Sequence, residues 1–383
     1  MTITVGGRQA SRVDLRRHAV ALLRLTLGYD LRASDRCAWE GVFRMAARER
    51  CAALAWLRSR ETISRLAPAR VVAAWRREVV RASEHGCRQL GRYAVFLHRL
   101  DDAGAEPVVL KGMPLSQRLY SDPFVRLAHD LDVVVRPDRR DIARSIAVEL
   151  GWRRVAGTAP FEENFAWHDE RERMWIDLHS SALSDRLSHL HLPLPEHAPC
   201  AIHGFSFRAH SGPLMPGTLA AHLAKHELPP FLWLIDFATL WSLIGHDGRN
   251  ASRRAASQAG LGRYLEWAQV MAAGVAAAAE DDPGALGALG IEPGLRRDRN
   301  GIWRDLRFAV SAGDAMAVLG DWIWPRGERT TLRALPRSAA SRLRARAGSL
   351  LMTAEKYGAP SPMPHWNDPI RPDRHGERER WIV

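Results

Sequence analysis

The sequence predicts an α+β protein in which a small mixed β-sheet lies between two helical regions. Apolar residues recur every three or four positions over residues 13–102, which is the spacing of helices with one buried face. Short apolar and β-branched runs separated by turn residues follow, and helical spacing then returns. We therefore expect an N-terminal helical region at 1–104, a sheet-containing core at 105–212, a C-terminal helical region at 213–356 and a loosely ordered tail at 357–383.

Length and composition fit such a fold. A chain of 383 residues with 46% hydrophobic and 26% charged residues is long enough for two or three packed units and is not largely disordered. Its formal net charge of +12 is carried almost entirely by arginine, because lysine occurs only at positions 111, 225 and 356. Heavy use of Arg and Ala is typical of genome-wide compositional drift. The charge alone therefore does not imply nucleic-acid binding.

Cysteine spacing and hydropathy indicate the cellular compartment in which the protein is expected. Cys37, Cys51, Cys87 and Cys200 form no Cys-x-x-Cys pair, which argues against a zinc knuckle or a disulfide scaffold. The chain shows no N-terminal apolar run with a cleavage site and no apolar stretch long enough to span a bilayer. We expect a protein of the reducing cytoplasm with no membrane partner.

The core is expected to begin as a strand, a helix and a second strand. An apolar run at 108–110 ends on Lys111-Gly112, a helical rhythm follows at 113–120, and a strand at 131–135 ends in three β-branched residues. The elements expected next are a helix at 137–150, a strand at 152–155, and a hairpin of 165–168 with 174–179.

The C-terminal helical region is expected to follow an extended segment at 202–208. Thr218 can cap a helix at 219–227. After a two-proline break, apolar spacing predicts helices at 231–244 and 263–279.

Asp130 and Asp132 are candidate metal ligands. Side chains two apart on a strand project to one face, so both carboxylates can meet one cation. Two carboxylates at the mouth of a buried strand are costly unless a cation compensates them, although such pairs also occur in surface turns. Asp177, in an otherwise apolar run of the hairpin, is the candidate third carboxylate. Mg²⁺ prefers oxygen ligands, and three carboxylates suit a two-metal site for triphosphate chemistry.

Lys111 and Gly112 form a candidate phosphate site. They close a strand just before a helix, where backbone N–H groups and the helix dipole favour phosphate. Glycine allows a close approach, and Lys111 adds a compact charge in a chain that otherwise uses arginine. A turn glycine beside a solvated lysine is the alternative.

Together these residues resemble one protein family. The segments that carry the resemblance are Val109-Leu-Lys-Gly112, Tyr120-Ser-Asp-Pro123, Arg126-Leu-Ala-His-Asp-Leu-Asp-Val-Val-Val135 and Ile176-Asp-Leu-His179. In order and spacing they are similar to the bacterial uncharacterised nucleotidyltransferase family of the polymerase-beta-like superfamily. The resemblance implies an NTP substrate and Mg²⁺ or Mn²⁺, with phosphates at Gly112 and metal at Asp130, Asp132 and Asp177. It gives Arg126 a phosphate or structural contact.

Two further segments of the chain resemble a second sequence pattern of the same family: His222-Leu-Ala-Lys225-His226 and Trp233-Leu-Ile-Asp236. Lys225 or His226 is expected to border the nucleotide cleft, with Asp236 capping or pairing with one of them. A histidine satisfied by helix packing is the alternative. His222 and His226 share a helix face but lack the glutamate of a zinc-protease motif.

The expected reaction is transfer of a nucleotidyl group from an NTP to an unidentified acceptor. Family members occur in small gene clusters, including those for modified peptides, so the resemblance suggests a peptide or small metabolite. Walker-type, dinucleotide, serine-nucleophile and kinase signatures are all missing from the sequence. The alternatives are a toxin-like or antibiotic-modifying transferase of the same superfamily and a non-catalytic nucleotide-binding regulatory module. A helical nucleic-acid-binding protein rests on charge alone.

Overall fold

The computed structural model gives the fold of most of the chain up to residue 280. It describes residues 4–5, 8–9, 12–31, 38–126, 128, 130–155, 162–167, 174–183, 192, 194–224 and 230–280. The predicted C-terminal region beyond residue 280 and the predicted tail lie outside the described residues. The unit limits predicted at residues 104, 212 and 356 stay predictions.

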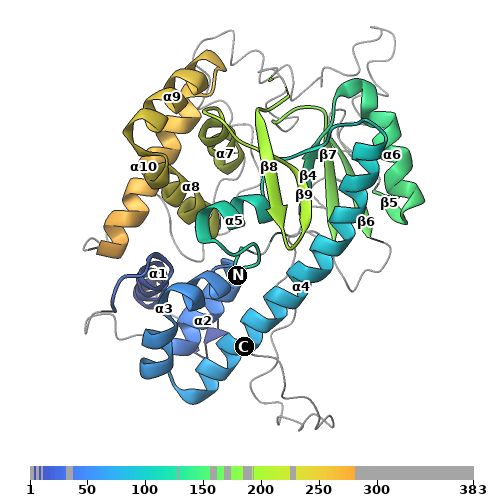
Figure 1. The fold of residues 1–383 in the computed structure, drawn as a ribbon. Helices are drawn as coiled ribbons and strands as arrows, with labels where there is room; N and C mark the ends of the chain where they lie inside the picture. Colours follow the sequence, from blue (N-terminus) through green and yellow to red (C-terminus); the bar gives the residue numbers. More distant parts are fainter. Residues whose placement is uncertain are drawn as a thin grey trace, which may run out of the picture.

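The N-terminal part is helical, as the apolar spacing predicts. Its helices are α1 (Arg12–Leu27), α2 (Trp39–Arg48), α3 (Ala52–Leu66) and α4 (Ala69–Asp102). A short strand β1 (Thr4–Val5) pairs with β2 (Arg8–Gln9) ahead of α1. α4 is 34 residues long and runs from the other N-terminal helices across to the sheet (Figure 1).

The sheet is mixed and has seven strands in the order β5-β6-β7-β4-β3-β9-β8. Its strands are β3 (Val108–Val109), β4 (Asp130–Val134), β5 (Trp152–Arg154), β6 (Glu162–Trp167), β7 (Trp175–His179), β8 (His197–Ile202) and β9 (Phe205–His210). β4 lies antiparallel to β3 and parallel to β7, while β3 lies parallel to β9. The predicted α+β class with a mixed sheet is confirmed.

One face of the sheet packs against α4 and α6 (Arg140–Glu149). Leu131 and Val133 of β4 join Ile176 and Leu178 of β7 in this core, together with Phe96 of α4. These strand residues alternate with polar ones, so the polar side chains of β4 and β7 are directed to the opposite face. The alternation therefore separates a hydrophobic layer from a polar one within the same strands.

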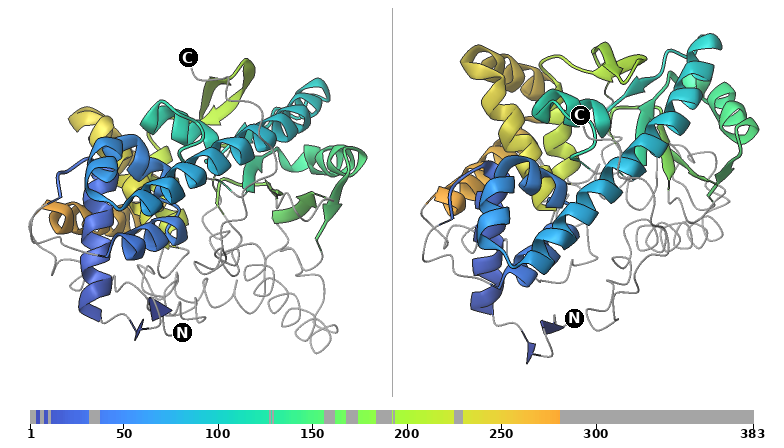
Figure 2. Two further views of the ribbon diagram at one scale, coloured as in Figure 1. Left: turned by 90° about the horizontal axis from the view of Figure 1, so that it is seen from below. Right: turned by 60° about the horizontal axis from the view of Figure 1, so that its bottom comes forward.

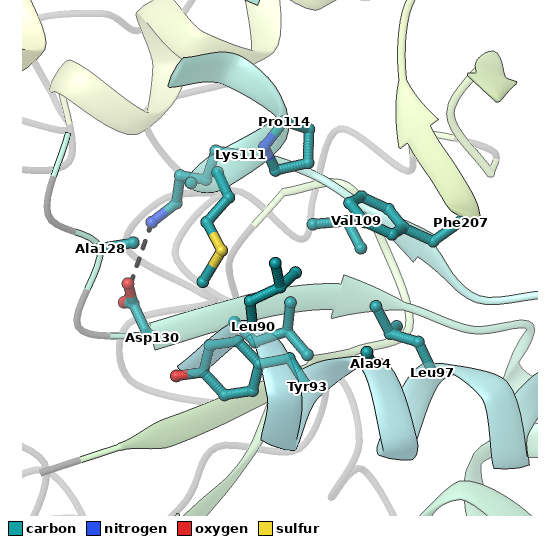
Figure 3. Close-up of a pocket in the computed structure, with 13 residues that line it drawn as sticks. Leu90, Tyr93, Ala94, Leu97, Val109, Lys111, Pro114, Ala128, Asp130 and Phe207 are labelled. Carbon is teal, nitrogen blue, oxygen red and sulfur yellow. Dashed lines mark ion pairs between the residues drawn. The ribbon is translucent and has the colours of Figure 1, made fainter. Parts of the chain in front are cut away.

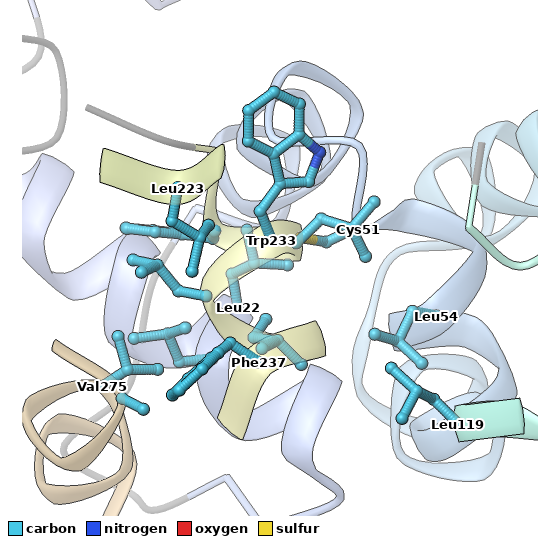
Figure 4. Packing of buried hydrophobic residues seen from close by; sticks show 14 of the residues in the cluster. Leu22, Cys51, Leu54, Leu119, Leu223, Trp233, Phe237 and Val275 are labelled. Carbon is cyan, nitrogen blue, oxygen red and sulfur yellow. The ribbon is translucent and has the colours of Figure 1, made fainter. Parts of the chain in front are cut away.

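The C-terminal helices pack against the N-terminal helices. They are α7 (Met215–Ala224), α8 (Phe231–Leu243), α9 (Gly245–Gln258) and α10 (Gly262–Glu280). Leu22 of α1, Leu54 of α3, Phe237 of α8 and Val275 of α10 belong to one buried cluster (Figure 4). The views in Figure 2 show these helices beside the sheet, with α4 joining the two parts.

Helix α5 (Met113–Tyr120) links the two parts from the sheet side. Leu115 and Leu119 lie in the helical cluster, whereas Met113 lies in the core beneath the sheet. Pro114 occupies the first turn, where the missing N–H costs little, and Ser121 ends the helix in the left-handed conformation. The turn that begins α5 is thereby held between both cores.

Three details of the C-terminal half differ from the sequence-based expectation. The segment expected to be extended at 202–208 is a hairpin, because His203-Gly204 adopts positive φ angles and turns β8 back into β9. Thr218 does not cap a helix, since α7 begins at Met215 and the Thr218 hydroxyl donates to the Met215 carbonyl. α9 was not predicted, because only Ser252 and Ala256 of its residues are buried and its apolar stripe is too short to recognise.

Candidate active site

The polar face of the sheet gathers the three predicted carboxylates. Asp132 of β4 and Asp177 of β7 are directly paired across the parallel strands, and Asp130 lies two residues before Asp132 on the same face. Their exposed fractions are only 9% for Asp130, 5% for Asp132 and 6% for Asp177. Three carboxylates buried this deeply require compensation by cations or hydrogen bonds.

Lys111 supplies one such cation. Its Nζ lies 2.6 Å from Asp132 Oδ2, and the side chain is 8% exposed. The same Nζ lies 3.9 Å from Asp130 Oδ2 (Figure 3). The 2.6 Å contact is an ion pair between two buried side chains. Lys111 is thus not a solvated surface lysine, and its ammonium is directed at the aspartate pair.

The protonation of Asp132 reflects these neighbours. Burial and the nearby Asp130 charge favour the neutral acid, but Lys111 and a contact from His179 outweigh them, so the pKa of Asp132 is lowered. The carboxylate is therefore ionised at neutral pH and available as an acceptor or ligand.

Gly112 shapes the turn above the carboxylates. Its φ of 86° lies in the region that glycine adopts without strain. A Cβ at this position would lie 3.4 Å from the Ala128 side chain and 3.9 Å from the Asp130 carbonyl oxygen, so the turn passes close to the start of β4. The N-terminus of α5 follows immediately, which brings its dipole to the same place.

Two further polar side chains join the carboxylates on this face. Asn164 of β6 is directly paired with Asp177, and its Nδ2 donates to Asp177 Oδ1 over 2.6 Å. His179 lies two residues after Asp177, and its Nε2 is 3.4 Å from Asp132 Oδ1. Both are buried, at 3% and 5% exposure. Neither residue is among the site residues predicted from the sequence.

Arg126 is held by the C-terminal helices. Its Nε lies 2.5 Å from Asp236 Oδ2 on α8, and Asp236 Oδ1 accepts a 2.7 Å hydrogen bond from the Tyr120 hydroxyl. Arg126 also interacts electrostatically with Asp130. Burial lowers the pKa of Arg126, but Asp236, Tyr120 and Asp130 outweigh it, so the guanidinium stays charged. Of the two roles that the resemblance gives Arg126, these contacts match the structural one; a phosphate contact stays a prediction.

A comparison with known protein families shows which family the chain is related to. The family model described as "Uncharacterised nucleotidyltransferase" matches residues 35–275, which is more than half of the chain. The protein belongs to this family. The resemblance that the Lys-Gly, Asp-x-Asp and Asp-Leu-His segments predict is confirmed. No curated protein and no solved structure matches the chain.

The nucleotidyltransferase family implies an NTP substrate, and the donor set of this member fits a divalent cation. One ligand atom from each of Asp132, Asp177 and His179 lies within 4.8 Å of the other two. Asp130 is not part of this group, although it lies beside Lys111. Among the contacts given above, Lys111 lies beside Asp130 and Asp132, Arg126 lies beside Asp236, and Asp177 accepts a hydrogen bond from Asn164. Bound positive charge suits such a cluster.

A small cavity beneath the Lys111-Gly112 turn supports this arrangement. It measures about 20 Å³ and is bordered by Leu90, Tyr93 and Leu97 of α4 and by Phe207 of β9 (Figure 3). This volume holds little more than one water molecule. The apolar residues therefore act as a support for the turn rather than as a nucleotide pocket.

The flanking histidine pattern is only partly visible. Lys225 and His226, predicted to border the nucleotide cleft, lie outside the described residues. His222 packs against Trp233 with ring centroids 5.0 Å apart. Asp236 pairs with Arg126 and Tyr120. Its expected capping of, or pairing with, Lys225 or His226 stays a prediction, because those two residues lie outside the described part of the chain.

No helix in the part of the chain that the structure describes has both the length and the apolar character needed to cross a membrane.

Proposed function

We propose that this protein is a metal-dependent nucleotidyltransferase that moves a nucleotidyl group from an NTP to an acceptor of the peptide or small-metabolite class. The observation that carries the proposal is the direct pairing of Asp132 with Asp177, which groups three buried carboxylates beside the Lys111-Gly112 turn. An ion pair with a purely structural role would not need three carboxylates on one buried face of a sheet. Triphosphate chemistry does use such a group.

The triphosphate is proposed to bind over the turn at Gly112. The positive end of the α5 dipole and the glycine backbone favour phosphate oxygens there. Lys111 contributes its ammonium from the edge of the same turn. In this arrangement Lys111 neutralises Asp132 before substrate binds and is drawn to the phosphates afterwards.

The transfer itself is an in-line displacement. An acceptor oxygen forms a bond to the α-phosphorus, the bond from that phosphorus to the α,β-bridging oxygen breaks, and pyrophosphate leaves. Asp130, Asp132 and Asp177 would hold the divalent cation, which when bound neutralises the triphosphate and activates the acceptor oxygen. Asp177 takes the proton that the acceptor oxygen loses. Asn164 keeps Asp177 oriented through its 2.6 Å hydrogen bond.

Pyrophosphate release tests this proposal. The full chain is incubated with each NTP and Mg²⁺ or Mn²⁺, with and without candidate peptide and metabolite acceptors from its gene neighbourhood. Release that depends on acceptor and is lost in Asp132→Asn supports the proposal. A matched control is Asp138→Asn, because the Asp138 side chain is 62% exposed and lies outside the carboxylate group. Tight Mg²⁺–NTP binding without transfer to any acceptor would instead favour the regulatory module.

A further inference from the structure

The imidazole of His179 changes the chemistry of the proposed metal site. His179 is 5% exposed and shares the ligand group with Asp132 and Asp177. It comes from the same strand as Asp177, two residues further on, so both side chains project to the same face of β7. The site thus offers one nitrogen beside its carboxylate oxygens.

The spacing between His179 and Asp132 is that of two ligands of one ion. Nε2 lies 3.4 Å from Asp132 Oδ1, which is longer than the roughly 2.9 Å typical of a good N–H···O hydrogen bond. Ligand atoms about 2.1 Å from a common ion lie roughly 3.0–3.4 Å apart, depending on whether the coordination is octahedral or tetrahedral. The distance is therefore long for a hydrogen bond and suitable for coordination.

Nitrogen ligation has a consequence for metal choice. Mg²⁺ is a hard ion that takes oxygen ligands and keeps several waters. Imidazole suits first-row transition ions, and affinity for a mixed N/O site rises from Mn²⁺ through Co²⁺. A site made of carboxylates alone lacks this nitrogen-specific gain.

We infer that His179 is a metal ligand and that it makes the site select a first-row transition ion, of the Co²⁺ or Fe²⁺ class, over Mg²⁺. The inference rests on the proposed function, because it assigns the ion of the same site. It replaces Mg²⁺ as the expected ion and leaves the role of the carboxylates unchanged.

The competing role for His179 is to orient Asp132 by a hydrogen bond. The two roles predict different effects on selectivity. A residue that only orients a carboxylate changes the affinity for every ion in the same direction, as second-shell partners do. A nitrogen ligand affects Co²⁺ much more than Mg²⁺.

The test measures Co²⁺ and Mg²⁺ affinities by calorimetry on the full chain without NTP. In His179→Gln we expect Co²⁺ affinity to fall at least about tenfold, the lower bound seen for outer-shell partners, with little change for Mg²⁺. Asn164→Ala is the matched control, because Asn164 touches Asp177 from the neighbouring strand and is not in the ligand group. It should weaken both ions by a similar factor. An unchanged Co²⁺-to-Mg²⁺ ratio in His179→Gln overturns the inference.

A measurement on the parent protein keeps the inference testable if His179→Gln does not fold. Electron spin-echo spectroscopy of the Mn²⁺-loaded chain should show modulation from a directly bound nitrogen. Its absence overturns the inference. The proposed function fails separately, through Asp132→Asn. If Asp132→Asn binds ions as tightly as the parent, the metal site is misplaced and both proposals are wrong. If Asp132→Asn loses ion binding but His179→Gln keeps the parental Co²⁺-to-Mg²⁺ affinity ratio, only the present inference is wrong.

Discussion

Asp132 and Asp177 are direct partners across the parallel strands β4 and β7. This register places two carboxylates side by side on a buried sheet face, with Asn164 on the next strand fixing Asp177. Two ionised groups at this spacing repel one another unless positive charge lies between or beside them. The pairing therefore links the strand order of the fold to a requirement for bound cations.

Substitution of Asp132 should remove cooperative binding of metal and nucleotide. Asp132→Asn keeps the size of the side chain but lacks the charge that contacts Lys111 and a cation. We expect the affinity for Mg²⁺–NTP to fall at least about tenfold, because even the loss of an outer-shell partner typically costs about that much. Calorimetry with the exposed-site variant Asp138→Asn measured in parallel checks this, and equal binding by parent and Asp132→Asn would place the metal elsewhere.

Lys111 is expected to have two separable roles. Lys111→Ala should weaken NTP binding, because a charge beside the phosphates is lost, and Lys111→Arg should recover only part of it. Without ligands, Lys111→Ala should also lower the Tm, because Asp130 and Asp132 lose their shared cation. Added Mn²⁺ should then raise the Tm of the alanine variant more than that of the parent. Parental NTP affinity and parental Tm in Lys111→Ala would contradict both roles.

The buried contact between Arg126 and Asp236 should be a large contributor to stability. Asp236→Ala leaves the buried guanidinium without its carboxylate, which typically costs about 3–5 kcal/mol. Tyr120→Phe removes the hydrogen bond to the same carboxylate, together with one to Thr239, and should cost about 1.5–3 kcal/mol. Urea denaturation gives both free energies of unfolding. The double variant Arg126→Met with Asp236→Leu should lose less stability than Asp236→Ala alone, and a larger loss would argue against a charge-pair origin.

His210 should make stability depend on pH. Its Nδ1 and Nε2 lie 3.0 Å from the Glu196 carbonyl and the Thr218 hydroxyl, and burial, aided by Arg118, lowers its pKa despite the Glu196 contact. The unfolded chain therefore binds a proton at His210 more readily than the folded one. The stabilisation is fully present above the unfolded pKa of about 6.5 and is lost as pH falls below it.

The matched variant for this prediction is His210→Asn, whose amide can still donate towards Glu196. It should be less stable at neutral pH but should show a weaker decline in free energy of unfolding between about pH 8 and about pH 5. Parallel pH profiles for parent and variant would show that other groups are responsible.

The sequence predicted most of the sheet and most of the polar side chains that gather on one of its faces. Asp130 and Asp132 could be selected because they stand two residues apart at the mouth of an expected strand, and Asp177 because it interrupts an apolar run. Lys111-Gly112 could be selected because it closes a strand before a helix. The alternation of Asp177 and His179 was also readable, but a histidine next to a turn carries no metal signal by itself. Only the distance between His179 and Asp132 in the folded protein makes His179 a candidate metal ligand.

Contacts that depend on strand register or helix packing were not predictable. Asn164 could not be assigned, because the register of β6 on β7 depends on pairing between two strands and not on a local sequence pattern. The contacts of Asp236 with Arg126 and Tyr120 were not predicted either, because they arise where α8 packs against the end of α5 and the segment that leads into β4. Tertiary packing, rather than proximity in sequence, chooses such partners.

The most direct test of the three-carboxylate site compares turnover and nucleotide binding in Asp177→Asn. The amide has the size of the carboxylate and can still form hydrogen bonds. It carries no negative charge to bind a cation, and it cannot take the proton that the acceptor oxygen loses. We predict that pyrophosphate release falls by orders of magnitude, while Mg²⁺–NTP affinity falls far less because Asp130 and Asp132 remain. Asp141→Asn, at a side chain that is 87% exposed, should match the parent. Turnover in Asp177→Asn equal to that of the parent would contradict the account.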